Sequence, residues 1–77
     1  IEQREMKLQK LKLGAASPFI GKTLRESGIR ERYNCMVVGL EEGQDNLTRV
    51  NPNHRFAQGD IVWVVGEKAS LKSLPDA

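Results

Sequence analysis

The most reactive side chains of this chain belong to one cysteine, one histidine and two adjacent glutamates. Cys35 is the only cysteine and His54 is the only histidine, and they lie far apart in the sequence. A cysteine nucleophile needs a base within hydrogen-bond reach of its thiol, and distant His54 is the only candidate. We therefore predict that Cys35 is a small core residue and not a nucleophile.

The histidine and the glutamates also lack the neighbours that catalysis would need. No second metal-ligand candidate lies near His54, so we predict a surface histidine in preference to a metal site or a pH switch. Glu41 and Glu42 are adjacent, but nothing beside them would poise either carboxyl group as an acid, and we predict a solvated turn. The glycines are not spaced as in a phosphate-binding loop. The sequence thus predicts that the protein is not an enzyme.

The charge of the chain is nearly balanced. Its 77 residues include 12 Lys and Arg and 10 Asp and Glu, for a formal net charge of +2. This balance is too mild to indicate a nucleic-acid or membrane surface. An aromatic content of 5% leaves no stacking platform for single strands. We therefore expect no nucleic-acid partner.

The length and the apolar runs limit the organisation of the chain. A chain of 77 residues forms one domain at most, and so small a core often gains burial from an oligomer or a covalent neighbour. The longest apolar run, 35–40, is too short to span a bilayer, and polar residues 1–5 lack the apolar part of a signal peptide. We expect a cytoplasmic domain over 6–77, with 1–5 as a lead-in from a longer parent chain.

The first element is predicted to be a strand. Residues 6–8 and 11–13 each alternate apolar with basic residues, as in a half-buried strand, but the phase slips at 9–10. Since one extra residue reverses the buried face, we predict a bulge or a sharp bend there. Lysines along this segment are typical of a protected edge strand. In the alternative, 1–5 are a helical lead-in and the strand begins near Met6.

A short helix is predicted after Pro18. Proline suits the start of a helix, and Ile20 and Leu24 are four positions apart on one helical face. Gly28 is able to adopt the left-handed conformation that ends a helix, and Ile29 would then pack back onto the last turn. A helix of about two turns depends on packing against the rest of the domain.

Three further strands and a closing helix are predicted. The apolar run 35–40 is typical of a strand covered on both faces, and a hairpin turn over 41–46 leads to a short half-polar strand, 47–50. Residues 61–65 are the most β-prone of the chain, and 67–74 form a closing helix. The order predicts an α+β fold: a small β-α-β-β-β-α domain whose mostly antiparallel sheet packs against two short helices.

With that order in place, the chain resembles the TrkA C-terminal domain, also called the C-terminal domain of the RCK (regulator of potassium conductance) family. The likeness covers roughly 6–74, and its ordered pieces are more specific than any one alone. They are Ser17-Pro18-Phe19-Ile20-Gly21-Lys22-Thr23-Leu24-Arg25-Glu26, Gly28-Ile29-Arg30-Glu31-Arg32-Tyr33, Val37-Val38-Gly39-Leu40, Asn51-Pro52 and Gln58-Gly59-Asp60-Ile61-Val62-Trp63-Val64-Val65-Gly66.

The resemblance implies a regulatory domain of monovalent-cation transport. Such domains usually follow a Rossmann-like nucleotide-binding domain or hang from an antiporter or channel, and they usually pair as homodimers. In several members a small ligand, in some cases cyclic di-AMP, binds between the two copies. For this chain the resemblance implies attachment to a membrane cation transporter or channel, in the same polypeptide or complex, at the inner face of the cell membrane.

The resemblance also implies positions for ligand contacts. Arg30 falls where the family contacts a nucleotide phosphate, and an arginine fork suits that role. The alternative is a solvated arginine paired with Glu26 or Glu31. Ile29 falls on a position lining the cleft, although core packing explains it equally well. Pro52 falls on another cleft position, where the preferred alternative is a strand terminator.

Two positions depart from the pattern of the cyclic di-AMP binders. Met36 stands where that pattern has an asparagine that reads the base, and Cys35 stands where it can have histidine. A site built on polar contacts loses discrimination when those side chains are absent. Neighbouring Asn34 would be a partial substitute, so Asn34 joins the candidate ligand-binding residues.

Two functions follow from the resemblance. In the first, ligand binding across the dimer cleft favours one orientation of the two copies, and attached domains carry this bias to the membrane part. In the second, the domain is a structural dimerisation and coupling module without a ligand of its own, as the departures at Cys35 and Met36 would favour.

Overall fold

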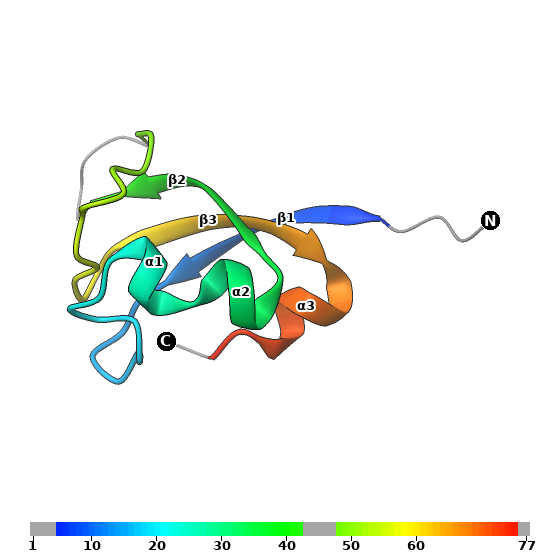
Figure 1. Ribbon diagram of the computed structural model, residues 1–77, viewed down its shortest axis with the longest axis horizontal. Coiled ribbons are helices and arrows are strands. Elements are labelled where there is room, and N and C mark those ends of the chain that lie inside the picture. The colour runs from blue at the N-terminus through cyan, green and yellow to red at the C-terminus, as the bar shows by residue number, and fades with distance from the viewer. Residues whose placement is uncertain (1–4, 43–47, 76–77) are drawn as a thin grey trace.

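The computed structural model describes residues 5–42 and 48–75 of the chain. Within these residues the chain forms three strands and three short helices, and their arrangement as one α+β unit can be followed in Figure 1. The elements in chain order are β1 (Met6–Lys12), α1 (Leu24–Ser27), α2 (Ile29–Tyr33), β2 (Met36–Glu41), β3 (Ile61–Glu67) and α3 (Lys68–Ser73).

The last strand of the chain lies in the middle of the sheet. The strand order is β1-β3-β2, and both pairings are antiparallel. The helices lie on one side of this sheet (Figure 1). The predicted α+β class with a mostly antiparallel sheet is therefore confirmed.

The core lies between the sheet and the helices. Along β3 buried and half-buried residues alternate, as expected of a central strand with one covered face. Val62 and Val64 are fully buried, and they pack with Leu13 from the segment after β1 and Ile29 at the start of α2.

The opposite face of the sheet is open and largely apolar. Met6 and Leu8 of β1 are 59% and 57% exposed, and Met36 and Val38 of β2 are 57% and 49% exposed. Leu8 and Met36 both pair with half-buried Val65 of β3, one from each side. We call these five residues the open face. The prediction that residues 35–40 are covered on both faces is wrong for this chain, because the helices cover only one.

The predicted bulge at 9–10 is absent from β1. The strand pairs with β3 in one continuous register from Met6↔Glu67 to Lys12↔Ile61. The slip in the sequence pattern instead marks a change of face: Leu8 lies on the open face, whereas Leu11 is buried in the core. An irregularity does occur in the sheet, but it lies in β2, where the register shifts between Val37 and Gly39.

The single predicted helix after Pro18 is two helices with a sharp break between them. Residues 18–21 form a turn, and α1 begins after Thr23, whose side chain and that of Glu26 form a capping box. Gly28 has φ +73, which confirms the predicted left-handed stop. Instead of folding back as a simple cap, Ile29 then starts α2 and is fully buried.

The predicted strand over 47–50 is reduced to one bridge. Thr48 and Leu40 exchange both backbone hydrogen bonds, at 2.8 and 2.9 Å. Leu47 and most of the predicted turn, 43–46, lie outside the described residues. The predicted closing helix is present as α3, and it ends before Pro75.

Candidate functional site

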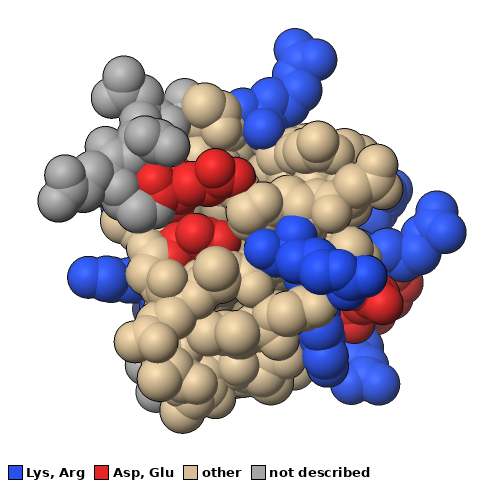
Figure 2. All heavy atoms as spheres, turned by 90° about the vertical axis from the view of Figure 1, so that its left-hand side faces the viewer, with Lys and Arg blue, Asp and Glu red and all other residues tan. Residues whose placement is uncertain are grey.

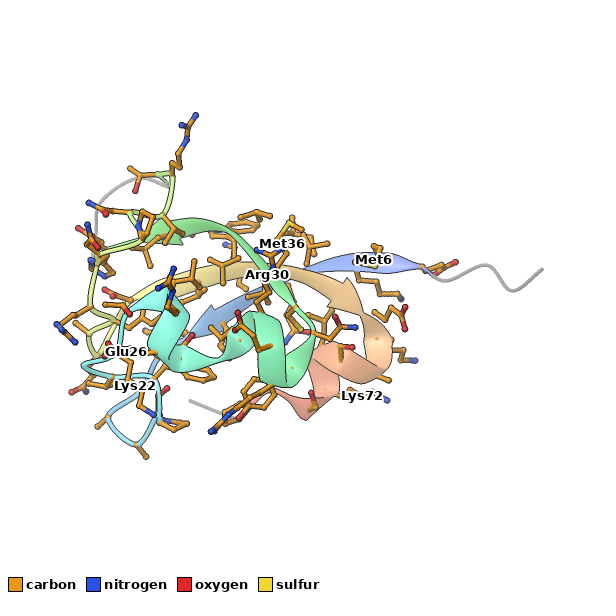
Figure 3. The ribbon with its side chains drawn as sticks, in the orientation of Figure 1. Met6, Lys22, Glu26, Arg30, Met36 and Lys72 are labelled. Atoms are coloured by element: carbon orange, nitrogen blue, oxygen red, sulfur yellow. The ribbon has the colours of Figure 1, made fainter. Side chains whose placement is uncertain are left out.

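A pocket of about 360 Å³ opens where α1, α2 and β2 meet. Its lining residues come from four segments that are separate in the sequence: Leu24, Arg25, Arg30, Glu31, Met36, Val37 and Pro52. Figure 3 shows Arg30 of α2 and Met36 of β2 close together near the middle of the view. We call this hollow the arginine pocket.

A second hollow of about 260 Å³ shares two of these residues. Arg30 and Met36 line it together with Asn34, Cys35 and open-face residues of the sheet. Arg30 therefore contributes to the lining of both hollows.

Of the other three candidate ligand-binding residues, the structure places two beside Arg30, one in each hollow. Pro52 lines the arginine pocket and Asn34 lines the second hollow. Ile29 is 0% exposed, so its side chain packs in the core, in agreement with the alternative that the sequence left open.

The arginine pocket contains residues that sequence reasoning did not single out. Arg25 is the most consequential, because with Arg30 it gives the pocket two guanidinium groups against the one carboxylate of Glu31. In one continuous helix, two residues five positions apart would point about 140° away from each other. The left-handed turn at Gly28 redirects the chain between them, so both arginines reach the same pocket.

A network of hydrogen bonds holds the start of α1 in place. Arg55 Nη1 donates to the Gly21 carbonyl at 2.9 Å and to Glu26 Oε1 at 3.1 Å. Glu26 also accepts from the Thr23 backbone amide at 3.0 Å. The pKa of Glu26 is lowered, first by the hydrogen bond with the Thr23 backbone and next by the hydrogen bond with the Thr23 side chain. The positive charge of Arg55 lowers it further. Arg55 thus ties a distant segment of the chain to α1, which carries Arg25.

Cys35 is buried, as predicted. It is 2% exposed, and its thiol donates to the Tyr33 carbonyl at 3.4 Å. Burial raises the pKa of this thiol, which makes it a poor nucleophile.

Two of the other reactive residues have partners that the sequence did not predict. Glu41 is the last residue of β2 and accepts a hydrogen bond from Trp63 Nε1 at 2.7 Å, so it is not part of a solvated turn. His54 is not a free surface residue, because its ring lies between the carboxylates of Glu42 and Asp60. The Lys10 ammonium group also lies over the Trp63 ring, with its Nζ atom 4.7 Å from the ring centroid.

Charges of both signs lie at one end of the molecule. Figure 2 looks onto the end of the molecule shown at the left of Figure 1, and both acidic and basic side chains appear there with broad uncharged areas between them.

Within 5–42 and 48–75, no group of three or more His, Cys, Asp or Glu is placed to hold a metal ion. No helix in the same ranges is long and apolar enough to cross a bilayer.

A family model described as the TrkA-C domain matches residues 8–76. Among curated relatives, the chain is 27% identical over 74 residues to an uncharacterised transporter of Synechocystis, covering 96% of this chain and 12% of that protein. It is 32% identical over 53 residues to potassium channel protein 1 of Methanocaldococcus jannaschii, covering 69% and 16%. It is 42% identical over 50 residues to the transporter YfbS of Escherichia coli, covering 65% and 8%. The chain thus spans between 8% and 16% of the length of these relatives.

Solved structures share the fold. The RCK C domain of the potassium transport protein KtrA, in complex with cyclic di-AMP, superposes with a TM-score of 0.75 at 25% identity, covering 88% of this chain and 78% of that one. The RCK_C domain dimer of S. agalactiae BusR, also in complex with cyclic di-AMP, gives 0.72 at 18% identity, covering 84% and 86%. The GsuK RCK domain gives 0.71 at 23% identity, covering 88% and 15%. At their lower identity, the last two are similar in fold alone.

Proposed function

The chain belongs to the TrkA-C domain family, and on that premise we propose that it is a cytoplasmic, ligand-sensing regulatory domain of a potassium or other monovalent-cation transport protein. The family match and the relatives, which include a potassium channel and two transporters, support this setting. The domain would act without catalysis, by binding.

The arginine pocket carries the proposal of a ligand. Arg25 and Arg30 place two guanidinium groups beside an apolar wall formed by Leu24, Met36 and Val37. Guanidinium groups bind phosphate oxygens in a bidentate manner, and an apolar wall suits a ring system stacked against it. The ligand that we propose is therefore a small nucleotide, and cyclic di-AMP is the first candidate because the KtrA domain binds it.

Dimerisation would complete the site. The pocket is open and includes Met36, which is also part of the open face. A second copy packed there would cover exposed apolar side chains and enclose the ligand between the copies. Ligand binding would then favour one relative orientation of the two copies and bias the attached transporter.

A coupling module without a ligand remains the second candidate. Met36 favours it, because a thioether cannot make the hydrogen bonds by which a polar side chain would read a base. The open face supports dimerisation in both versions, so the two differ only in the occupancy of the arginine pocket.

Thermal unfolding with a ligand panel separates these versions. The chain is heated alone and with cyclic di-AMP, ATP, ADP, NAD or NADH, while sedimentation reports its oligomeric state. A ligand at about a hundred times its Kd adds about 2.7 kcal/mol, which raises the Tm of so small a domain by roughly ten degrees or more. A shift that disappears in Arg30→Ala supports a sensor. A dimer whose Tm responds to none of the nucleotides supports the coupling module.

A further inference from the structure

Both ring nitrogens of His54 lie at hydrogen-bond distance from carboxylate oxygens. Nδ1 is 3.0 Å from Glu42 Oε1, and Nε2 is 2.9 Å from Asp60 Oδ2. The histidine and aspartate side chains are 20% and 6% exposed, whereas the glutamate side chain is 48% exposed. The Phe56 ring packs edge-on against the imidazole, with centroids 5.9 Å apart.

This arrangement requires one more proton than a neutral histidine carries. A neutral imidazole has one N–H donor and one acceptor nitrogen, whereas an ionised carboxylate only accepts. Asp60 Oδ2 also accepts from the Ala57 backbone amide at 2.9 Å, which fixes its role as an acceptor. With Nε2–H donating to Asp60, the contact with Glu42 is an ion pair only when Nδ1 is protonated as well.

The two carboxylates belong to opposite ends of the connection between β2 and β3. Glu42 directly follows β2, and Asp60 directly precedes β3. His54 joins them from within the segment 48–60, which we call the connecting segment. Pro52, two residues before the histidine, lines the arginine pocket. The position of this side of the pocket therefore depends on the contacts of His54.

The other charged groups near His54 have separate partners. Arg55, its neighbour in the chain, is paired with Glu26 of α1 at 3.1 Å. Glu41 at the end of β2 accepts from Trp63. In the described residues, the charged groups paired with the imidazole are thus Glu42 from the β2 side and Asp60 from the β3 side.

We propose that His54 is a proton-operated clasp that fixes the connecting segment, and with it the wall of the arginine pocket formed by Pro52, while both of its ring nitrogens are protonated. Histidine is the side chain whose charge changes between about pH 5 and 8. When Nδ1 loses its proton, the ring nitrogen and Glu42 become two acceptors facing each other and this half of the clasp opens. Asp60 keeps its bond, so the segment loosens on the β2 side alone. The clasp gives a regulator of cation transport a response to pH without any ligand.

Amide hydrogen exchange as a function of pH tests the clasp in the unliganded 77-residue chain. After correction for intrinsic exchange, the protected amides of the connecting segment should exchange about two- to fivefold faster at pH 8 than at pH 6, as expected for the loss of one solvent-screened ion pair. Long-range ¹H–¹⁵N spectra of the His54 ring should show both nitrogens protonated where the segment is protected and Nε2 alone protonated where the segment exchanges faster.

Glu42→Gln is the decisive variant. An amide of the same shape can donate to an unprotonated Nδ1, so neutral His54 would bond on both sides and the segment would stay protected at pH 8. Glu31→Gln, an equal charge change on α2, should keep the pH dependence of the unaltered chain. Equal exchange at the two pH values in the unaltered chain, a ring that is neutral where the segment is protected, or an unchanged pH response in Glu42→Gln would each overturn the proposal. None of these readouts involves nucleotide binding, so they stand apart from the test of the ligand.

Discussion

Arg25 and Arg30 line the same pocket although they belong to different helices. Their convergence depends on the backbone between them, where Gly28 adopts φ +73 and directs α2 away from the axis of α1. A backbone conformation that only glycine adopts readily thus determines the charge of the candidate site.

Replacement of this glycine should be costly. Gly28→Ala is expected to lower the free energy of unfolding by about 1–2 kcal/mol, because a Cβ disfavours the left-handed conformation. The new methyl group would also lie 3.0 Å from Arg32 Cδ, which a flexible side chain can relieve. Urea unfolding measures the change. Gly21→Ala is the matched control, since Gly21 has φ +81 and open space around it. This variant should lose similar stability, but because Gly21 does not lie between Arg25 and Arg30 it should keep nucleotide binding. Unaltered stability in Gly28→Ala would contradict this account.

The geometry of the guanidinium groups, and not their charge alone, should matter for binding. Arg30→Lys keeps the charge but loses the bidentate fork, so we expect its Kd for cyclic di-AMP to rise about tenfold or more, corresponding to about 1.4 kcal/mol. Titration calorimetry measures it. Arg32→Lys, on the same helix but outside the pocket lining, should bind as the unaltered chain does. Equal affinities in the two variants would remove Arg30 from the site.

The capping box of α1 should fail in acid. The folded-state pKa of Glu26 lies below its ordinary value of 4.5, so its contribution to stability is present above that value and is lost as the pH falls through the folded-state pKa. We expect the first turn of α1 to lose amide protection below about pH 4.5. Hydrogen exchange of the Glu26 and Ser27 amides measures the loss, and Glu26→Gln should remove this pH dependence. A first turn that stays protected down to pH 2 would show that other contacts hold it.

The open face should govern self-association. Leu8 is 57% exposed, so Leu8→Glu should leave the unfolding of a monomer nearly unchanged while weakening a dimer by at least about tenfold, because a charge would be buried in the interface. Gln9→Glu adds the same charge on the next residue, which points to the other face of the strand, and should leave the dimer intact. Sedimentation velocity over a range of concentrations distinguishes them. Equal dimerisation in both variants would place the interface elsewhere.

Local signals predicted much of the fold. The stop at Gly28, the β-prone strand over 61–65 and the closing helix before Pro75 all depend on residues close together in the sequence; the structure has all three, although the strand continues through Gly66 to Glu67. The sequence did not reveal α2, because five residues are too few to show a helical period. The phase slip at 9–10 was visible, but either a bulge or a change of face explains it, and only the pairing with β3 decides between them.

The candidate site was less accessible to sequence reasoning. Arg30 was found through the resemblance, whereas Arg25 needed the angle between two helices. The partners of His54 come from the two ends of a connection, and no periodicity links such residues. What the sequence lacks in both cases is the direction in which a side chain points after the chain has turned.

The strand order has a consequence for how this domain forms. In the described residues, β1 and β2 each pair along their length with β3, which comes after both in the chain, and β2 has in addition the single bridge from Leu40 to Thr48. During synthesis the first two strands therefore wait for their main sheet partner until residues 61–67 have left the ribosome. Pairing β1 with β3 also closes a loop of most of the domain, which is costly in entropy and slow. Folding should accordingly be a late, all-or-none event, and a chain terminated before Ile61 should lack the three-stranded sheet.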